Sequence, residues 1–147
     1  MKIERIPSIK TRPLRYEVLW PHRESVDVCL IDIDDRPDAI HLAAYHNDEI
    51  VGVCSLFEMH SPKLTDNKQY RLRAMATHPS VRGKGAGRML VEQALSIVES
   101  SGYDVLWCDA REVALGFYAQ LGFERIDEWY DIPNIGKHQF MYYRFKR

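Results

Sequence analysis

The sequence predicts an α+β fold in which helices pack on a mixed, mostly antiparallel sheet. Two apolar runs flank the polar turn at residues 46–49, a pattern typical of a β-hairpin. A strand, a glycine-rich loop and an amphipathic helix follow one another between residues 70 and 102. A further strand, a short helix and an antiparallel pair of strands complete the chain. This order of elements indicates one sheet with helices packed on it.

The first 68 residues are expected to form strands, one helix and a polar loop. Thr11 is a favourable helix N-cap, and Pro21 ends the helix because proline cannot continue it. Acidic residues and Pro37 interrupt the apolar run that begins at Val26, so a strand and a packed loop both remain open there. The predicted elements are a strand over 2–6, a helix from 11 to 21, the ambiguous segment within 22–38, hairpin strands over 39–45 and 50–59, and a polar loop over 60–68.

The remaining residues carry the clearest periodicities. Apolar and longer side chains alternate with a period of two from Tyr70 to Thr77, which is typical of a strand. Apolar residues then recur at helical spacing from Met89 to Val98, and Gly102 is placed to cap that helix. The later elements are a strand over 104–110, a short helix over 112–120 that closes at Leu121-Gly122, and antiparallel strands over 123–129 and 138–145.

Length and composition limit the class of protein. The 147 residues are expected to form a single domain over 1–147. The 20 cationic and 21 acidic residues give no field that would recruit nucleic acid or an anionic membrane. No apolar run approaches the length of about 18 residues that a membrane span needs, and residues 1–10 lack the apolar core of a signal peptide. The three separated cysteines favour a reducing, cytoplasmic location, and no spacing of ligands predicts a metal.

The segment from Arg82 to Arg88 places three glycines and three cations between a strand and a helix. Glycines let a ligand approach the backbone, while successive N–H groups and the helix dipole favour an anion. The loop is not a Walker A motif, because Gly85 stands where Ser or Thr must follow Gly83-Lys84, nor a dinucleotide fingerprint, because Arg88 stands where a glycine is required. It is expected to hold a phosphate; a solvated turn is the alternative.

Two motifs resemble the GNAT superfamily of acyl-CoA-dependent N-acyltransferases. Arg82, Gly85 and Gly87 match its R/Q-x-x-G-x-G/A pyrophosphate signature, and residues 114–123 match the A-x-x-[FL]-Y-x-x-[LM]-G-F segment that follows its fifth strand. The tail further resembles a bacterial subgroup of small members. The resemblance implies a GNAT-like, mostly antiparallel central sheet that is splayed between strands four and five and flanked by about four helices, with acetyl-CoA in the cleft. It also implies direct transfer of the acetyl group, in a ternary complex, to a primary amine of a small molecule or protein.

The resemblance also implies the roles of individual residues. Tyr118 would give a proton to the CoA thiolate, since a tyrosine hydroxyl is a donor at neutral pH; packing against Phe117 and Phe123 is the alternative. Backbone groups of the fourth strand would pair with the pantetheine arm, and the glycine loop would hold the pyrophosphate. The residues expected to bind acetyl-CoA are Met75, Ala76, Thr77, Arg82, Gly83, Lys84, Gly85, Ala86, Gly87 and Arg88.

The group that deprotonates the acceptor amine stays open. The fourth strand carries no carboxylate, and the candidates are Glu58, His138, His41, Asp109 or a chain of waters. Arg73 and His138 are expected to meet on the acceptor's side of the sheet, where they would favour an acceptor with a carboxylate or phosphate near its amine. Ordinary ion pairs of the arginines and a turn-capping His138 are the alternative.

Two functions are therefore weighed. The first is an N-acetyltransferase with acetyl-CoA as acyl donor, an amine acceptor as partner and no metal; a homodimer is compatible with it. The second is a non-catalytic CoA-binding sensor or interaction module. Tyr118 beside an intact loop favours the first function. Cys108 is a poor candidate for a covalent acyl carrier, because no histidine adjoins it and free cysteines are usually buried.

Overall fold

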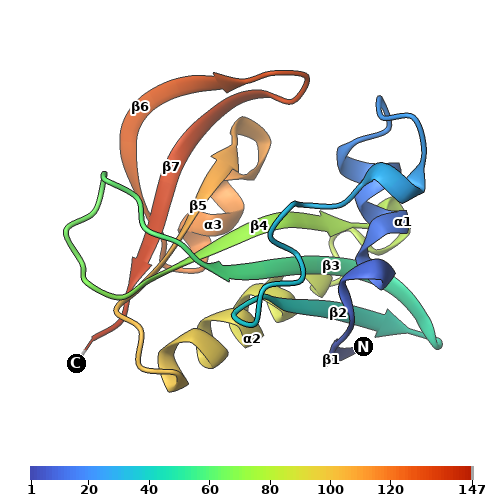
Figure 1. Ribbon diagram of the computed structural model, residues 1–147, viewed down its shortest axis with the longest axis horizontal. Helices are drawn as coiled ribbons and strands as arrows, with labels where there is room; N and C mark the ends of the chain where they lie inside the picture. Colours follow the sequence, from blue (N-terminus) through green and yellow to red (C-terminus); the bar gives the residue numbers. More distant parts are fainter. Residues whose placement is uncertain (147) are drawn as a thin grey trace. The chain divides into compact units, whose positions relative to one another are not determined.

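The computed structural model describes residues 1–146 and confirms a mixed α+β fold (Figure 1). Its seven strands are ordered β1-β2-β3-β4-β5-β7-β6. Strand β4 pairs with β5 in parallel, whereas the pairs β1–β2, β2–β3, β5–β7 and β6–β7 are antiparallel. The strands are β1 (Lys2–Arg5), β2 (Ile40–His46), β3 (Glu49–Glu58), β4 (Gln69–Thr77), β5 (Val105–Arg111), β6 (Glu124–Ile132) and β7 (Gly136–Arg144). The α-helices are α1 (Arg12–Leu14), α2 (Ala86–Ser100) and α3 (Leu115–Gln120).

The helix count corrects the sequence-based expectation of about four. Residues 1–146 contain three α-helices. The segment after Pro21, which was left open between a strand and a packed loop, forms turns and one 3₁₀ turn, Val26–Val28. Proline and the aspartates of this segment favour turns over helix. The choice left open between a strand and a packed loop is thereby decided for the loop. None of the helices in this described part of the chain has the length and apolarity to cross a membrane.

The described chain divides into two compact units. The first combines Met1–Phe57 with Leu72–Ala94, and the second combines Glu58–Arg71 with the chain from Leu95 onward. Strand β4 contributes residues to both units, and its described pairing with β5 stays within the second. The expectations of a single domain over 1–147 and of a sheet splayed between strands four and five stay predictions.

In the first unit, the hairpin of β2 and β3 is confirmed. Its turn residues Asn47 and Asp48 have φ of 50° and 63°. Two consecutive left-handed residues define a two-residue hairpin turn whose twist matches that of the strands, and Asn and Asp tolerate this conformation well. The four polar residues at 46–49 therefore specify the turn, and the flanking apolar runs specify the strands.

The N-terminal helical segment follows α1 with π-helical turns over Arg15–Leu19 and ends next to Pro21, as expected. Thr11 occupies the predicted N-cap position of α1, but its side chain does not cap the helix. Its hydroxyl donates to the carbonyl of Ser8 at 2.6 Å, which closes a preceding 3₁₀ turn, and its side chain makes no capping bond to α1. A threonine hydroxyl can accept a bond as a helix cap or donate one to a carbonyl of the preceding turn. The backbone of Thr11 is itself helical, which favours donation to the preceding turn.

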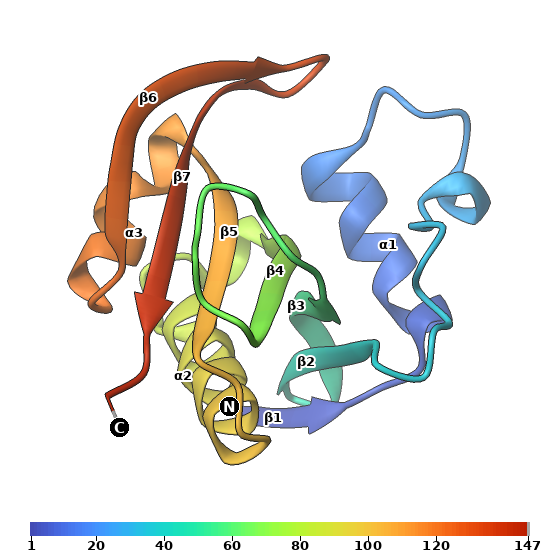
Figure 2. The same cartoon turned by 60° about the vertical axis from the view of Figure 1, so that its left-hand side comes forward.

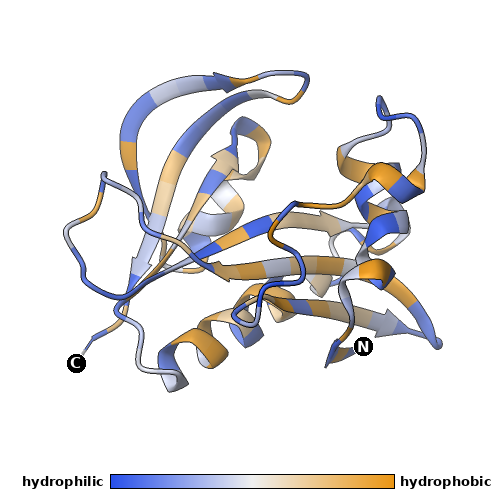
Figure 3. Cartoon of the chain, viewed as in Figure 1, coloured by the Kyte–Doolittle hydropathy of each residue, from blue (hydrophilic) through white to orange (hydrophobic). Residues whose placement is uncertain are grey.

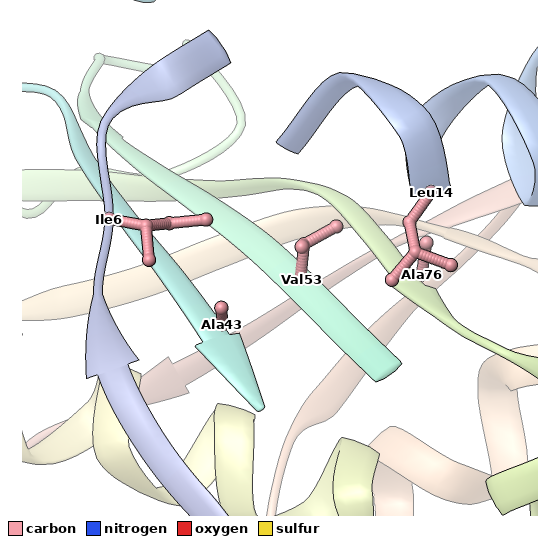
Figure 4. Packing of buried hydrophobic residues seen from close by; sticks show 5 residues of the cluster. All are labelled: Ile6, Leu14, Ala43, Val53 and Ala76. Carbon is pink, nitrogen blue, oxygen red and sulfur yellow. The ribbon is translucent and has the colours of Figure 1, made fainter. Parts of the chain in front are cut away.

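Buried apolar side chains join this segment to the strands of the first unit, as Figure 4 shows for Ile6, Leu14, Ala43, Val53 and Ala76. Helix α2 alternates apolar and polar positions (Figure 3), so it buries one stripe and exposes the other. A Cβ atom at Gly52 of β3 would lie 3.0 Å from a methyl carbon of Leu90. Glycine at this position lets α2 approach the strand closely.

The second unit contains β5, α3 and the β6–β7 pair, close to the predicted boundaries (Figure 1). Gly122 has φ of +98° and ends α3, as the Leu121-Gly122 pair predicted. The rings of Phe123 and Tyr143 lie 5.7 Å apart, which places this face of β7 against the end of α3. Trp107 of β5 stacks on Phe140 of β7 with ring centroids 5.1 Å apart. Because side chains alternate along a strand, Phe140 and Tyr143 lie on opposite faces of β7.

Candidate active site

The glycine loop connects β4 to α2 in the first unit. Gly83 and Gly85 have φ of +80° and +86°, a left-handed conformation that residues with a Cβ rarely adopt. The amide of Met89 donates to the carbonyl of Gly85, which makes this the first hydrogen bond of α2. The amides of Ala86, Gly87 and Arg88 precede it and are the ones that a helix N-terminus leaves for an anion.

Three cationic residues belong to this loop and to the first turn of α2. Arg82, Lys84 and Arg88 are all exposed, and Arg88 is tied only loosely to Glu92 one turn along α2, at 3.5 Å. An exposed ion pair of this kind is weak, so a phosphate group competes with it readily. Left-handed glycines, a helix N-terminus and exposed cations together offer the chemistry that a pyrophosphate requires.

The chain enters this loop through an ordered turn. His78 caps a 3₁₀ turn by accepting a hydrogen bond at Nδ1 from the amide of Ser80, and its Nε2 lies 3.4 Å from a carboxylate oxygen of Glu17. In the middle of β4, Ala74 has φ of +52°. A left-handed alanine within a strand is uncommon and interrupts the regular alternation of the backbone. The sequence pattern gave no sign of it, because alanine is compatible with an ordinary strand.

Tyr118 lies on α3 and is 5% exposed. Its ring is 5.0 Å from that of Phe117 and 5.2 Å from that of Phe123. The packing that the sequence offered as an alternative is therefore present. It does not decide the role of the hydroxyl, since a proton donor also needs a ring held in one place; the catalytic role stays a proposal.

Among the four side chains considered as the base, His41 is occupied by a buried network of the first unit. The Ser55 hydroxyl accepts a hydrogen bond from Arg15 at 2.9 Å, so its own proton goes to Nδ1 of His41 at 2.7 Å. Nε2 of His41 then donates to the carbonyl of Asp34 at 2.9 Å. Burial lowers the pKa of His41 and keeps it neutral. With both ring nitrogens engaged, His41 cannot take a proton from a substrate.

Asp109 and Glu58 both have partners in the second unit. The two carboxylate oxygens of Asp109 accept from Arg71 at 2.6 Å and from the hydroxyl of Tyr130 at 2.5 Å. Both oxygens of this carboxylate are thus engaged by donors of the chain itself. Glu58 is exposed and accepts a hydrogen bond from the hydroxyl of Tyr103. The contact between Arg71 and Asp109 is an ion pair, in agreement with the alternative given for Arg71 from the sequence.

His138 differs from the other three. It is 3% exposed and stacks on Tyr130 with ring centroids 6.2 Å apart. Its Nδ1 lies 2.7 Å from the carbonyl of Gly136 and therefore carries the proton of the neutral ring. Nε2 has no hydrogen-bond partner within residues 1–146, so its lone pair is available. Arg73 belongs to the first unit and His138 to the second, and their meeting stays a prediction.

The three cysteines are free and buried. Burial raises the pKa of Cys54 to about 12, and it also raises the pKa of Cys108, to which the neighbouring carboxylate of Asp109 adds. Since the thiolate is the nucleophile, a protonated and buried thiol is unsuited to carry an acyl group. This agrees with the low weight given to Cys108 from the sequence.

Comparison with known proteins identifies the class. The sequence model of the acetyltransferase (GNAT) family matches residues 6–123, which is more than half of the chain. The chain belongs to this family. Its members are acyl-CoA-dependent N-acetyltransferases, as the glycine loop and the Tyr118 segment predicted.

Particular relatives agree over nearly the full length. The uncharacterized N-acetyltransferase YitI of Bacillus subtilis (strain 168) is 33% identical over 142 residues, which are 97% of this chain and 95% of the relative. An aminoglycoside 6′-N-acetyltransferase complexed with coenzyme A has a TM-score of 0.77 at 17% identity, over 100% of this chain and 99% of that one. Escherichia coli ElaA has a TM-score of 0.74 at 18% identity, over 96% and 97%. At these identities the two solved structures show likeness of fold alone.

Proposed function

We propose that the protein transfers the acetyl group of acetyl-CoA directly to a primary amine of a small molecule or protein in a ternary complex. The observation that carries this proposal is the glycine loop, whose helix N-terminal amides and exposed cations suit a pyrophosphate. Residues 82–88 would hold that group, and backbone groups of Met75, Ala76 and Thr77 would pair with the pantetheine arm. We place the protein in the cytoplasm, where its buried free cysteines stay reduced.

Two side chains would then carry out the proton transfers of the reaction. An alkylammonium has a pKa near 10.4, so removing its proton at pH 7 costs about 4 to 5 kcal/mol. We assign this step to Nε2 of His138, the candidate base whose lone pair is available. The attacking amine displaces CoA as its thiolate, and the hydroxyl of Tyr118 would supply the proton that the thiolate takes up. The alternative, a CoA-binding module without turnover, requires neither role.

A panel of acceptors tests the activity and its substrate class. Free thiol released from acetyl-CoA is followed with polyamines, amino acids, aminoglycosides and peptides. Arg73 is proposed to contact an anionic group of the acceptor, so amines that carry a carboxylate or phosphate should have lower KM than their uncharged analogues. Binding of CoA without thiol release for any amine would favour the sensor over the transferase.

Gly87→Val is expected to weaken CoA binding by about tenfold or more, because a branched side chain at the helix N-terminus keeps the pyrophosphate from the backbone amides. Gly87 lies within α2, so valine there needs no left-handed backbone, unlike a substitution at Gly83 or Gly85 with their positive φ. Calorimetric titration with CoA measures the effect. Gly102→Val, at a positive-φ position after α2, controls for general loss of stability. Unchanged CoA affinity in a folded Gly87→Val protein would place the cofactor elsewhere.

His138→Gln is expected to lower kcat/KM by about tenfold or more at pH 7, with a defect that shrinks as the pH approaches 10. Glutamine keeps a hydrogen-bonding side chain but takes up no proton, whereas a high pH deprotonates the amine in solution. Steady-state rates between pH 6 and 10 give the profile. A defect that is equally large at all pH values would show that His138 positions other groups and is not the base.

A further inference from the structure

A lysine of the chain itself lies on an aromatic surface of the second unit. The ammonium nitrogen of Lys63 is 4.3 Å from the ring centroid of Tyr130 and 5.4 Å from that of Phe140. Both distances are within the range of a cation–π contact. No carboxylate within residues 1–146 forms an ion pair with this ammonium, so the ring faces alone hold it.

The loop that presents Lys63 is a built structure. It runs from Met59 to Lys68 and lies alongside β5 and β7 (Figure 2). The side chain of Gln69, 1% exposed, accepts from the amide of Ser61 at 2.7 Å and donates to the carbonyl of Asp66 at 3.0 Å. Arg144 binds both carboxylate oxygens of Asp66 at 2.8 Å and lowers the pKa of that carboxyl. The loop therefore holds its lysine at a fixed place.

The surroundings of the rings beneath Lys63 favour the binding of a cation. The hydroxyl of Tyr130 donates to Asp109, and this bond to a carboxylate increases the electron density of the ring that faces the ammonium. Phe140 stacks on Trp107, whose other neighbour is the guanidinium of Arg71 at 4.8 Å. Arg71 is tied to Asp109 at 2.6 Å. Between Arg71 and Lys63, Lys63 is therefore the cation that can be exchanged.

The surface also adjoins a base, since His138 stacks on Tyr130 and keeps Nε2 without a partner in the described chain. A primary alkylammonium in the place of Lys63 would lie on the same ring as the group assigned to take its proton. We propose that the rings of Tyr130 and Phe140 form the binding site, or seat, for the alkylammonium of the acceptor. Lys63 occupies this seat as an intramolecular competitor, which the acceptor must displace. The inference rests on the proposed function and narrows the acceptor class to aliphatic amines that present a cation on a flexible stem.

Binding of butyltrimethylammonium tests the seat without turnover, because a quaternary ammonium cannot be acetylated. Titration is followed by the NMR shift of its N-methyl protons with the full-length protein. Lys63→Met removes the tethered competitor and is expected to tighten binding about 3- to 10-fold. Lys68→Met is the matched control: the same charge is removed from the same loop at a lysine without an aromatic partner, and binding should change less than about twofold.

Two variants of Tyr130 complete the test. Tyr130→Leu removes the ring and is expected to weaken binding about tenfold or more, while Tyr130→Phe keeps the ring and should bind within about threefold of wild type, which controls for folding. Equal affinities of Lys63→Met and Lys68→Met for the probe would overturn the proposal. Weaker binding by Lys63→Met would also overturn it, because Lys63 would then be a residue that binds an anion. If the probe binds as expected but the protein acetylates no amine, the proposed function is refuted and the cation-binding site is not.

Discussion

Replacing Tyr118 by phenylalanine is expected to lower kcat by about 100-fold or more while the Kd for CoA stays near that of the wild type. The ring of Tyr118 is buried between Phe117 and Phe123, and phenylalanine keeps both ring contacts. The substitution therefore removes the hydroxyl and keeps this ring packing. Thiol release with saturating amine gives kcat, and calorimetry gives the Kd for CoA.

A matched control is available on β7. Tyr143 is also in ring contact with Phe123, at 5.7 Å, so Tyr143→Phe removes a hydroxyl from the same aromatic cluster and should leave kcat within about twofold. Thermal melting of both variants separates loss of the proton donor from loss of the fold. A fully active Tyr118→Phe protein would reduce Tyr118 to a packing residue, and the proton of the thiolate would have to come from water.

The elements that were predictable from sequence are those specified by neighbouring residues. The hairpin follows from Asn47 and Asp48, which adopt the left-handed turn, and the end of α2 follows from Gly102. The glycine loop was recognisable because its glycines, cations and flanking elements are contiguous. In each case the physical constraint acts over a few residues, so the pattern that meets it can be read directly.

The features that sequence reasoning missed depend on contacts between distant residues. The loop carrying Lys63 is organised by one buried glutamine, Gln69, which looks like any polar residue at the start of a strand. The four candidate bases were equivalent in the sequence and became distinct only through their partners. His41 is separated by 14 residues from Ser55, which engages its ring, and Asp109 by 38 from Arg71. Residue spacing carries no information about such pairs.

The largest effect on stability is expected from Asp34→Ala. Arg15 is fully buried, and both its terminal nitrogens donate to the carboxylate of Asp34, at 2.7 and 2.9 Å. Removing the carboxylate leaves a buried, unpaired guanidinium, which costs about 3 to 5 kcal/mol of the free energy of unfolding. Denaturant unfolding at pH 7 measures this loss. Asp35→Ala is the control, because Asp35 is exposed and its bond to the hydroxyl of Ser8 contributes about 1 kcal/mol or less.

The same difference in stability has a predicted pH dependence. Burial alone would raise the pKa of Asp34, but the hydrogen bonds from Arg15 and from the amide of Ile31 outweigh it and hold the pKa below its usual value. A carboxyl whose pKa is lower in the folded state stabilises the fold above its unfolded pKa, and that contribution is lost as the pH falls through the folded pKa. The gap between wild type and Asp34→Ala should therefore be constant from pH 7 to about pH 5 and shrink below about pH 4. A gap that stays constant down to pH 2 would mean that the ion pair with Arg15 does not stabilise the fold.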